Sequence, residues 1–239
     1  MTKVTDRRLH ALATRAEGVF ATRNATADLP PIVVEFAGSP KSGKSTNIDV
    51  ISHFLKRMGF KVWAPTEGAS KRTPYHLRRD LVAFNTWALN YAISELLVAY
   101  YNIDRPHLVI LDRGPFDSVA WMGLLKTKKQ LSQEEYRIVK HFALHPKWSS
   151  LINQVYLFTC SPDVSLDREH KVTLTRRPGT AMNNAMLTGL LSQYQELHKE
   201  LKDYPVTDID TTSTTEPVDT AFLIVTSILD LFTRQQNAS

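Results

Sequence analysis

Gly38-Ser39-Pro40-Lys41-Ser42-Gly43-Lys44-Ser45-Thr46 has the pattern G-x-x-x-x-G-K-S, with a glycine at each end of a short turn and a lysine and a serine after it. The apolar run Ile32–Ala37 precedes this stretch, and a helix-like segment from Thr46 to about Met58 follows it. A strand, a Gly-rich turn and a helix N-terminus in this order are the context that a phosphate-binding loop requires. The alternative, a chance Gly/Ser/Lys loop, does not account for this context.

Each residue type in the loop has a physical task. Gly38 and Gly43 allow a tight backbone turn, so that successive N–H groups point inward at phosphates, where the helix dipole adds positive potential. We expect Lys44 to reach the β and γ phosphates and Ser45 to offer its hydroxyl to Mg²⁺. With ATP and Mg²⁺ as cofactors, the predicted binding residues are Gly38, Lys41, Ser42, Gly43, Lys44, Ser45 and Thr46.

Composition indicates one globular domain with a terminal extension. The chain has 239 residues, of which 43% are hydrophobic and 22% charged. The single Cys160 excludes an internal disulfide, no signal sequence is recognisable at the start, and the apolar stretch Ala221–Phe232 is too short to cross a bilayer. We therefore expect a cytoplasmic protein that does not enter a membrane. The net charge of +5 is scattered, so nucleic acid is allowed as a partner but not favoured.

Five short apolar runs alternate with helical patterns after residue 30. The runs are Ile32–Ala37, Lys61–Pro65, His107–Leu111, Gln154–Thr159 and Val206–Ile209. Such alternation predicts a parallel sheet with helices on both faces, a three-layer α/β fold. Residues 1–30 are expected to form a helical extension, helical from Thr2 to about Arg23, and a linker, and residues 31–239 the main domain.

Chemically useful side chains follow the predicted strands, where ligands bind in such sheets. Asp112 can hold Mg²⁺ while Arg113 clamps a phosphate oxygen; a solvated strand-end ion pair is the alternative. Glu67 can accept the proton of an attacking hydroxyl, or it is a solvated surface residue. Asp163 and Asp210 follow the fourth and fifth strands.

Two further segments carry candidate binding residues. Phe84, Trp87 and Tyr91 form an aromatic stripe on a helix, which is more often core than ligand platform; Asn85 in that stripe needs a polar partner, and a nucleobase edge provides one. Arginines between residues 168 and 182 would neutralise charge from a closable flap, or they belong to a solvated basic loop. They are Arg168, Arg176 and Arg177.

The order of phosphate loop, Glu67, the pair Asp112-Arg113 and an arginine-bearing lid resembles the thymidylate kinase and deoxynucleoside kinase group of P-loop kinases. The resemblance spans roughly residues 31–212 and has no counterpart for residues 1–30 or 126–153. It implies a P-loop NTPase fold with a helical lid at about residues 168–182. It also implies that Asp112 and Arg113 handle magnesium and the acceptor, and that Glu67 is the general base.

The same resemblance extends to the acceptor side. Phe84-Asn85-Thr86-Trp87-Ala88 is similar to a Phe-Gln-Thr-Tyr-Ala stretch whose amide reads the base, so Asn85 would inherit that role. Lys41 stands where some thymidylate kinases have an arginine. Pro40 and Thr66 stand where those enzymes have an aspartate and an arginine, and Gly114–Ser118 differs from both branches, so the acceptor's identity stays open.

The sequence therefore predicts an ATP-dependent phosphotransferase acting on a nucleoside or nucleoside monophosphate, a small-molecule partner, with a homodimer compatible. In the predicted site, Lys44, Glu67, Asp112, Arg113, Arg176 and Arg177 are catalytic; Glu67, Phe84, Asn85, Trp87, Arg113 and Arg168 bind substrate; Ser45 and Asp112 bind the metal. One alternative is a kinase acting on a polynucleotide end or another small molecule. Another is an ATP-binding switch without catalysis.

Overall fold

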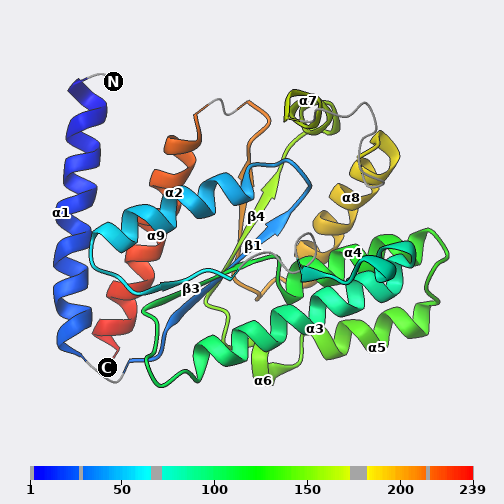
Figure 1. Ribbon diagram of the computed structural model, residues 1–239, viewed down its shortest axis with the longest axis horizontal. Helices are drawn as coiled ribbons and strands as arrows, with labels where there is room; N and C mark the ends of the chain where they lie inside the picture. The colour runs from blue at the N-terminus through cyan, green and yellow to red at the C-terminus, as the bar shows by residue number, and fades with distance from the viewer. Residues whose placement is uncertain (1–2, 27–28, 66–71, 173–181, 214–215, 239) are drawn as a thin grey trace.

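The computed structural model describes residues 3–26, 29–65, 72–172, 182–213 and 216–238, and its centre is a five-stranded sheet (Figure 1). All strand pairs are parallel, in the order β2-β3-β1-β4-β5. The strands are β1 (Ile32–Gly38), β2 (Val62–Trp63), β3 (Leu108–Asp112), β4 (Gln154–Thr159) and β5 (Val206–Asp210). The predicted α/β fold with five parallel strands is confirmed.

Helices connect the strands, because parallel neighbours require long crossover connections. The α-helices are α1 (Lys3–Ala25), α2 (Lys44–Arg57), α3 (Leu81–Tyr100), α4 (Pro115–Thr127), α5 (Gln133–Ala143), α6 (Pro146–Ser149), α7 (Pro162–Val172), α8 (Asn184–Glu200) and α9 (Pro217–Asn237). The 3-10 helix η2 (Tyr75–Arg79) leads into α3. Most of the 126–153 segment, for which the sequence comparison identified no counterpart, forms α5 and α6.

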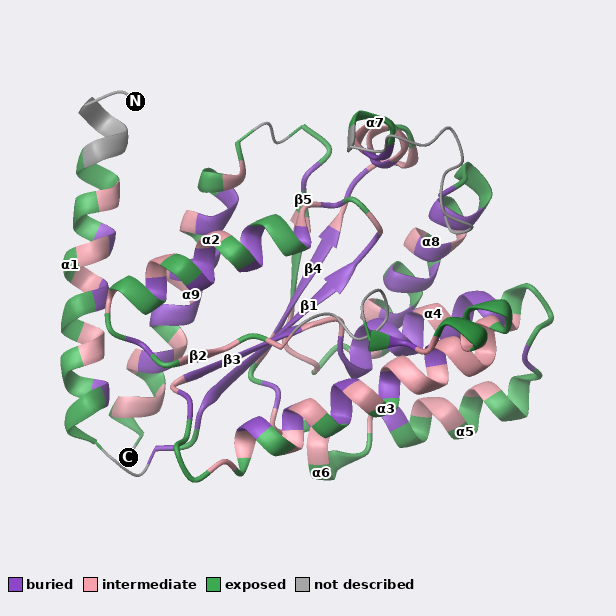
Figure 2. Cartoon of the chain, in the orientation of Figure 1, coloured by how far each residue is buried: buried purple, intermediate pink, exposed green. Residues whose placement is uncertain are grey.

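Alternate residues along a strand face opposite sides of the sheet, so β1 contributes to two cores. Val33 and Ala37 belong to a buried cluster with residues of α3, α4 and α8. Ile32, Val34 and Phe36 belong to a second cluster with residues of α1, α2 and α9. Figure 2 shows the inner strands buried, whereas β5 is more exposed at the edge of the sheet.

The N-terminal helix α1 is part of the second core. Leu12 and Ala16 are buried in that cluster, and α1 packs along α9 (Figure 1). An ion pair between Arg15 and Asp230 joins the two helices at the surface. The predicted helix is therefore present, slightly longer than the expected Thr2–Arg23, and it covers α9. The division of the chain at residue 30 stays a prediction.

Helix α3 is the one described helix that by length and composition alone is apolar enough to cross a membrane. In this fold Leu89, Ile93 and Leu96 are buried in the first core cluster, and α3 packs against α4 and β3. Its apolar character thus matches that of a core helix.

Several element boundaries differ from the sequence prediction, and three of them concern the neighbourhood of the loop and the sheet edges. Strand β2 is shorter than the expected Lys61–Pro65, because its pairing with β3 covers only Val62 and Trp63. The fifth strand continues to Asp210, which pairs with Thr159. Helix α2 begins at Lys44 instead of Thr46, directly after the left-handed backbone of Gly43.

Candidate active site

The phosphate loop connects β1 to α2 and contains three residues with positive φ: Gly38 at 134°, Lys41 at 59° and Gly43 at 93°. Gly38 must be a glycine for a second reason. A Cβ atom there would lie 1.9 Å from the carbonyl oxygen of Phe158 on β4. The loop therefore depends on close contact with the neighbouring strand as well as on its own turn geometry.

Lys44 is the first residue of α2, and its side chain turns back across the loop. It is 6% exposed, and its Nζ donates to the carbonyl oxygens of Gly38 at 2.9 Å and Ser39 at 2.8 Å. Ser42 closes the turn through a 2.8 Å hydrogen bond from its Oγ to the Ser39 carbonyl. The predicted phosphate lysine thus lies in the loop, with its positive charge enclosed by it.

The end of β3 meets the start of α2. The Ser45 Oγ donates to the Asp112 Oδ2 at 3.2 Å, and the Arg113 backbone N–H donates to the Phe36 carbonyl at 3.0 Å. The Arg113 guanidinium lies 3.4 Å from the Gly38 carbonyl oxygen. The parallel pairing of β1 with β3 therefore brings together residues that were predicted from two separate motifs.

The Ser45 hydroxyl and the Asp112 carboxylate are hard oxygen donors, the kind that Mg²⁺ prefers. Mg²⁺ is commonly held by one or two protein oxygens together with substrate phosphates, so this pair fits it. Among the described residues, no group of three or more His, Cys, Asp or Glu side chains could hold a metal by itself. A metal here would need ligands from a bound nucleotide or water.

Helix α7 contacts the phosphate loop at Lys41, on the side away from Asp112 and Arg113. The Arg168 Nη1 donates to the Lys41 carbonyl at 3.1 Å, and its Nη2 donates to the Thr211 carbonyl at 2.7 Å. The Lys41 Nζ forms a 2.9 Å ion pair with Glu169. Arg168 and Lys41, predicted as substrate and cofactor contacts, are thus joined to each other and to the end of β5.

Thr211, directly after the fifth strand, has a structural role. Thr211 is buried, and its Oγ1 donates to the Ser42 carbonyl at 2.9 Å, which ties the loop to the end of β5. Hydrogen bonds from Thr212 lower the pKa of Asp210. Asp163 is exposed in the first turn of α7. Thr46 is exposed in the first turn of α2.

The predicted base-binding residues share helix α3 but differ in environment. Asn85 is buried, and its Nδ2 donates to the Leu81 carbonyl at 2.7 Å, one turn back in the same helix. Trp87 is half-buried and stacks on Tyr91, with ring centroids 5.3 Å apart. Phe84 is also half-buried. The Asn85 amide therefore has a partner without any ligand, whereas the aromatic side chains are partly accessible.

Three predicted site residues lie outside the described residues: Glu67, Arg176 and Arg177. The general base and the lid arginines therefore stay predictions. Of the predicted lid at 168–182, the structure describes its first part within α7 and its last residue, Met182.

Sequence analysis missed two buried carboxylates beside the loop. Glu35, in the middle of β1, is fully buried and accepts hydrogen bonds from the backbone N–H groups of Gly114, Phe116 and Asp117. Asp117 accepts from the Gly38 N–H at 2.8 Å and from the Arg113 guanidinium at 2.8 Å. The available signals were a charge inside an apolar strand and an acid one helical turn after Arg113.

Burial and the nearby Asp117 raise the pKa of Glu35 to about 8, although the three backbone N–H groups oppose this shift. Tyr194 of α8 donates its hydroxyl to the same Asp117, and burial raises the pKa of Tyr194 well above its ordinary value. Tyr194 is therefore a permanent hydrogen-bond donor in this buried group.

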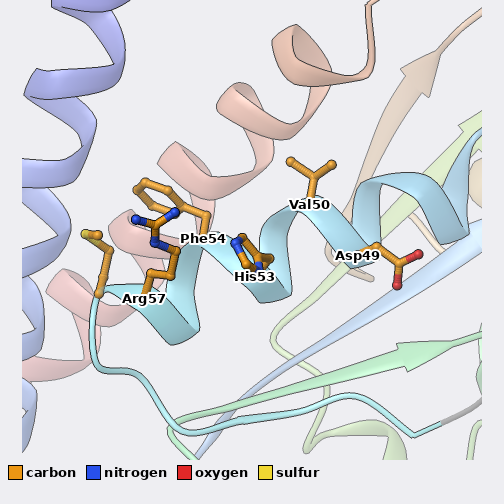
Figure 3. Close-up of a pocket in the computed structure, with 6 residues that line it drawn as sticks. Asp49, Val50, His53, Phe54 and Arg57 are labelled. Carbon is orange, nitrogen blue, oxygen red and sulfur yellow. The ribbon is translucent and has the colours of Figure 1, made fainter.

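The part of the chain that the structure describes also encloses cavities. One of about 800 Å³ lies between α8 and the ends of β4 and β5, with Cys160, Tyr194 and His198 in its wall. Another, of about 530 Å³, lies on the outer face of α2 (Figure 3). Its lining residues are Asp49, Val50, His53, Phe54, Arg57 and Met58. The first lining includes Asp210, which follows the fifth strand, but neither lining includes a residue that was predicted to be catalytic or to bind the cofactor, the substrate or the metal.

Solved structures of deoxyadenosine kinase from M. mycoides share this arrangement of elements. The structure with bound dATP has a TM-score of 0.61 and 18% identity over 83% of this chain and 100% of that chain. The structure with bound dCTP has a TM-score of 0.60 and 17% identity over 83% and 99%. The structure with products dCMP and a flexible dCDP has a TM-score of 0.55 and 16% identity over 84% and 100%.

No protein-family model matches the chain, and no curated protein matches it in sequence. The likeness therefore concerns the arrangement of the backbone. On that ground, the chain has the P-loop α/β fold of the deoxynucleoside kinases.

Proposed function

We propose that the protein is an ATP-dependent phosphotransferase that acts on a nucleoside or a nucleoside monophosphate. The observation that carries this proposal is the meeting of two motifs. The Lys44 ammonium lies across the phosphate loop, and the Ser45 hydroxyl lies 3.2 Å from the Asp112 carboxylate at the end of the adjacent strand. Phosphoryl transfer needs this combination of cationic loop, metal-binding oxygens and a nearby arginine.

The donor end is the phosphate loop. Its backbone N–H groups and the N-terminus of α2 would hold the phosphates, and Lys44 would leave the carbonyls of Gly38 and Ser39 to contact them. Ser45 and Asp112 would hold Mg²⁺, which would neutralise phosphate charge when bound. Lys41, at the outer side of the loop, would exchange its ion pair with Glu169 for a phosphate contact.

The acceptor end would begin at Arg113, whose guanidinium can clamp a phosphate oxygen. Glu67 would accept the proton of the acceptor hydroxyl, with Asp112 as the alternative base. Phe84 and Trp87 would offer aromatic surface to the base, and Asn85 would have to exchange its bond to the Leu81 carbonyl for the base edge. Arg176 and Arg177 would neutralise charge on the transferred group, while Arg168 would hold the loop.

A deoxynucleoside is the acceptor we favour. The similar structures are of deoxyadenosine kinase, with deoxynucleotides bound. Pro40 and Thr66 also replace residues that thymidylate kinases carry on the acceptor side. A reducing compartment with ATP, such as the cytoplasm, suits this activity and the free Cys160.

The test is incubation of the protein with ATP, Mg²⁺ and a panel of nucleosides, nucleoside monophosphates and oligonucleotides with 5′-hydroxyl ends. We expect a deoxynucleoside to gain the mass of one phosphoryl group, with transfer lost when EDTA replaces Mg²⁺. A mass gain on a monophosphate would keep the kinase assignment and change the acceptor. A gain on oligonucleotides alone, or on nothing while ATP still binds, would contradict the proposal.

A further inference from the structure

A group of buried polar and charged side chains connects the phosphate loop to the start of α4. It consists of Glu35 from β1, Arg113 after β3, Asp117 in the first turn of α4 and Tyr194 from α8. Glu35, Asp117 and Tyr194 are each at most 1% exposed, and the Arg113 side chain is 17% exposed. Burying charged groups in this way costs free energy unless they are paired and hydrogen-bonded, so their arrangement needs a reason.

Glu35 binds the backbone between Arg113 and the first turn of α4. Its Oε1 accepts from the N–H groups of Gly114 at 3.0 Å and Asp117 at 2.8 Å, and its Oε2 accepts from Phe116 at 3.2 Å. A Cβ on Gly114 would lie 2.6 Å from the Glu35 carboxyl carbon, so the backbone at Gly114 is in close contact with the Glu35 side chain. Glu35 therefore closes the N-terminus of α4 and fixes the turn that follows Arg113.

That turn contains backbone strain. Arg113 has a φ of 67°, in the left-handed region that residues other than glycine seldom adopt. Such a conformation persists where surrounding contacts impose it, and it is concentrated at functional sites. The three hydrogen bonds to Glu35 supply those contacts immediately after Arg113.

Asp117 fixes the position of the Arg113 side chain. Its Oδ2 accepts from the Arg113 Nη1 at 2.8 Å, while its Oδ1 accepts from the Gly38 N–H at 2.8 Å and from the Tyr194 hydroxyl. One carboxylate thus binds the arginine, the first residue of the phosphate loop and a tyrosine of α8. The distance between the arginine and the loop is set through this carboxylate.

We propose that Asp117, supported by Glu35, is a positioning residue that holds the Arg113 guanidinium beside the first peptide of the phosphate loop. This inference rests on the proposed function, in which Arg113 contacts the acceptor or the transferred phosphate. Asp117 contacts neither directly. It acts by keeping the arginine and the loop at a constant separation, and positional errors of about 1 Å in such sites cost about a hundredfold in rate.

Asp117→Asn is the decisive variant, because it removes one contact of the three. The asparagine Oδ1 can still accept from Gly38 and Tyr194, but its NH₂ group faces the Arg113 guanidinium, donor against donor. Tyr156→Phe is the matched control: Tyr156 is a buried tyrosine that loses one hydrogen bond, to Ser227, in the other core cluster.

We expect Asp117→Asn to lower kcat by about tenfold to a hundredfold. Tyr156→Phe should leave kcat within about twofold of the wild type, the scatter expected of changes outside the site. Arg113→Ala is combined with Asp117→Asn in a double-mutant cycle. If Asp117 acts through Arg113, the second change has little further effect on kcat once the first is present. Independent, multiplying effects would overturn the inference, as would wild-type kcat in Asp117→Asn.

NMR of the arginine side chains supplies a readout that does not depend on turnover. The Arg113 guanidinium N–H signals, assigned by their loss in Arg113→Ala, should be slowly exchanging in the wild type and in Tyr156→Phe. They should broaden or disappear in Asp117→Asn. If the wild type transfers no phosphoryl group, the proposed function fails, yet these spectra still decide whether Asp117 holds Arg113. Unchanged signals in Asp117→Asn would refute the positioning role.

Discussion

Helices α2 and α4 both begin after a glycine in the connection that follows the carboxyl end of a parallel strand, but their N-termini differ. Helix α2 starts after Gly43, which has no side chain to accept from the first N–H groups of the helix. Helix α4 starts after Gly114, and there the carboxylate of Glu35 accepts three backbone N–H groups. Because hydrogen-bond acceptors are favoured at each of these N-termini, the protein supplies its own acceptor, the Glu35 carboxyl group, to α4, and we expect a phosphate to be the acceptor at α2.

The difference teaches how similar local structures acquire different tasks. At α2 the nearby cation is Lys44, which belongs to the helix and can turn toward a ligand. At α4 the nearby cation is Arg113, which is tied to Asp117 within the protein. A helix N-terminus is therefore a site only where the rest of the fold does not already satisfy it.

The largest effect is expected from a substitution that removes the cation of α2. Lys44→Ala should lower phosphoryl transfer by on the order of a thousandfold or more, because the ammonium is proposed to stabilise the charge of the transferring group. A coupled ATP-consumption assay measures the rate, and urea unfolding checks that the fold is intact. Lys56→Ala, exposed near the end of the same helix, is the control and should retain activity. Retained activity in Lys44→Ala would contradict the assignment of the loop.

The next largest effect is expected on stability, from a substitution in the turn before α2. Gly38→Ala should lower the free energy of unfolding by about 3 kcal/mol or more, since its Cβ would lie 1.9 Å from the Phe158 carbonyl and φ is 134°. Gly18→Ala is the control, because no atom lies within 4 Å of the added Cβ in this exposed turn of α1. That change should stabilise the protein by about 0.5–1 kcal/mol. Equal unfolding midpoints for the two variants would show that the contact with β4 is unimportant.

The buried carboxyl group of Glu35 gives the stability a pH dependence. The pKa of Glu35 is raised from 4.5 to about 8 in the folded protein, so between these values the folded state holds a proton that the unfolded state has lost. The contribution of Glu35 to the free energy of unfolding is therefore complete below pH 4.5 and lost as the pH rises to about 8. The slope is at most about 1.4 kcal/mol per pH unit. The titratable groups that interact with Glu35 in the described structure include Asp117, Tyr194 and Tyr204.

Urea unfolding across this pH interval measures the slope. Glu35→Gln should flatten it, because the amide does not titrate, while Glu17→Gln on the exposed surface of α1 should leave it unchanged. A wild-type free energy of unfolding that rises across the interval, or a slope that survives in Glu35→Gln, would exclude a protonated Glu35 as its source.

The smallest expected effect concerns the metal at α2. Ser45→Ala should weaken the binding of Mg²⁺-ATP by about tenfold, which corresponds to about 1.4 kcal/mol. Binding of ATP without Mg²⁺ should change little, because the backbone and Lys44 contacts remain. Ser45→Thr keeps the hydroxyl and is the control. Calorimetric titrations with and without Mg²⁺ separate the cases, and an equal loss in both would mean that Ser45 contacts the phosphates and not the metal.

Sequence patterns predicted the sheet and the phosphate loop because both are local. The apolar runs identified the five strands, and the G-x-x-x-x-G-K-S pattern identified the turn with positive φ at Gly38 and Gly43. The end of β2 was misplaced, since pairing with β3 and not composition decides where that strand ends. Arg168 was predicted as a lid residue from charge and from the resemblance to the kinases, and neither indicates that its guanidinium binds the carbonyls of Lys41 and Thr211.

The sequence by itself determined that a Gly-rich turn with a lysine and a serine lies between a buried strand and a helix, because spacing of a few residues sets that geometry. Only the tertiary structure decided that Glu35 caps α4, across a separation of 79 residues from Gly114, and that Tyr194 binds Asp117, 77 residues away. These contacts depend on β1 lying beside β3 and on α8 packing against α4. Strand order and helix packing arise from the burial of whole faces, which no short motif encodes.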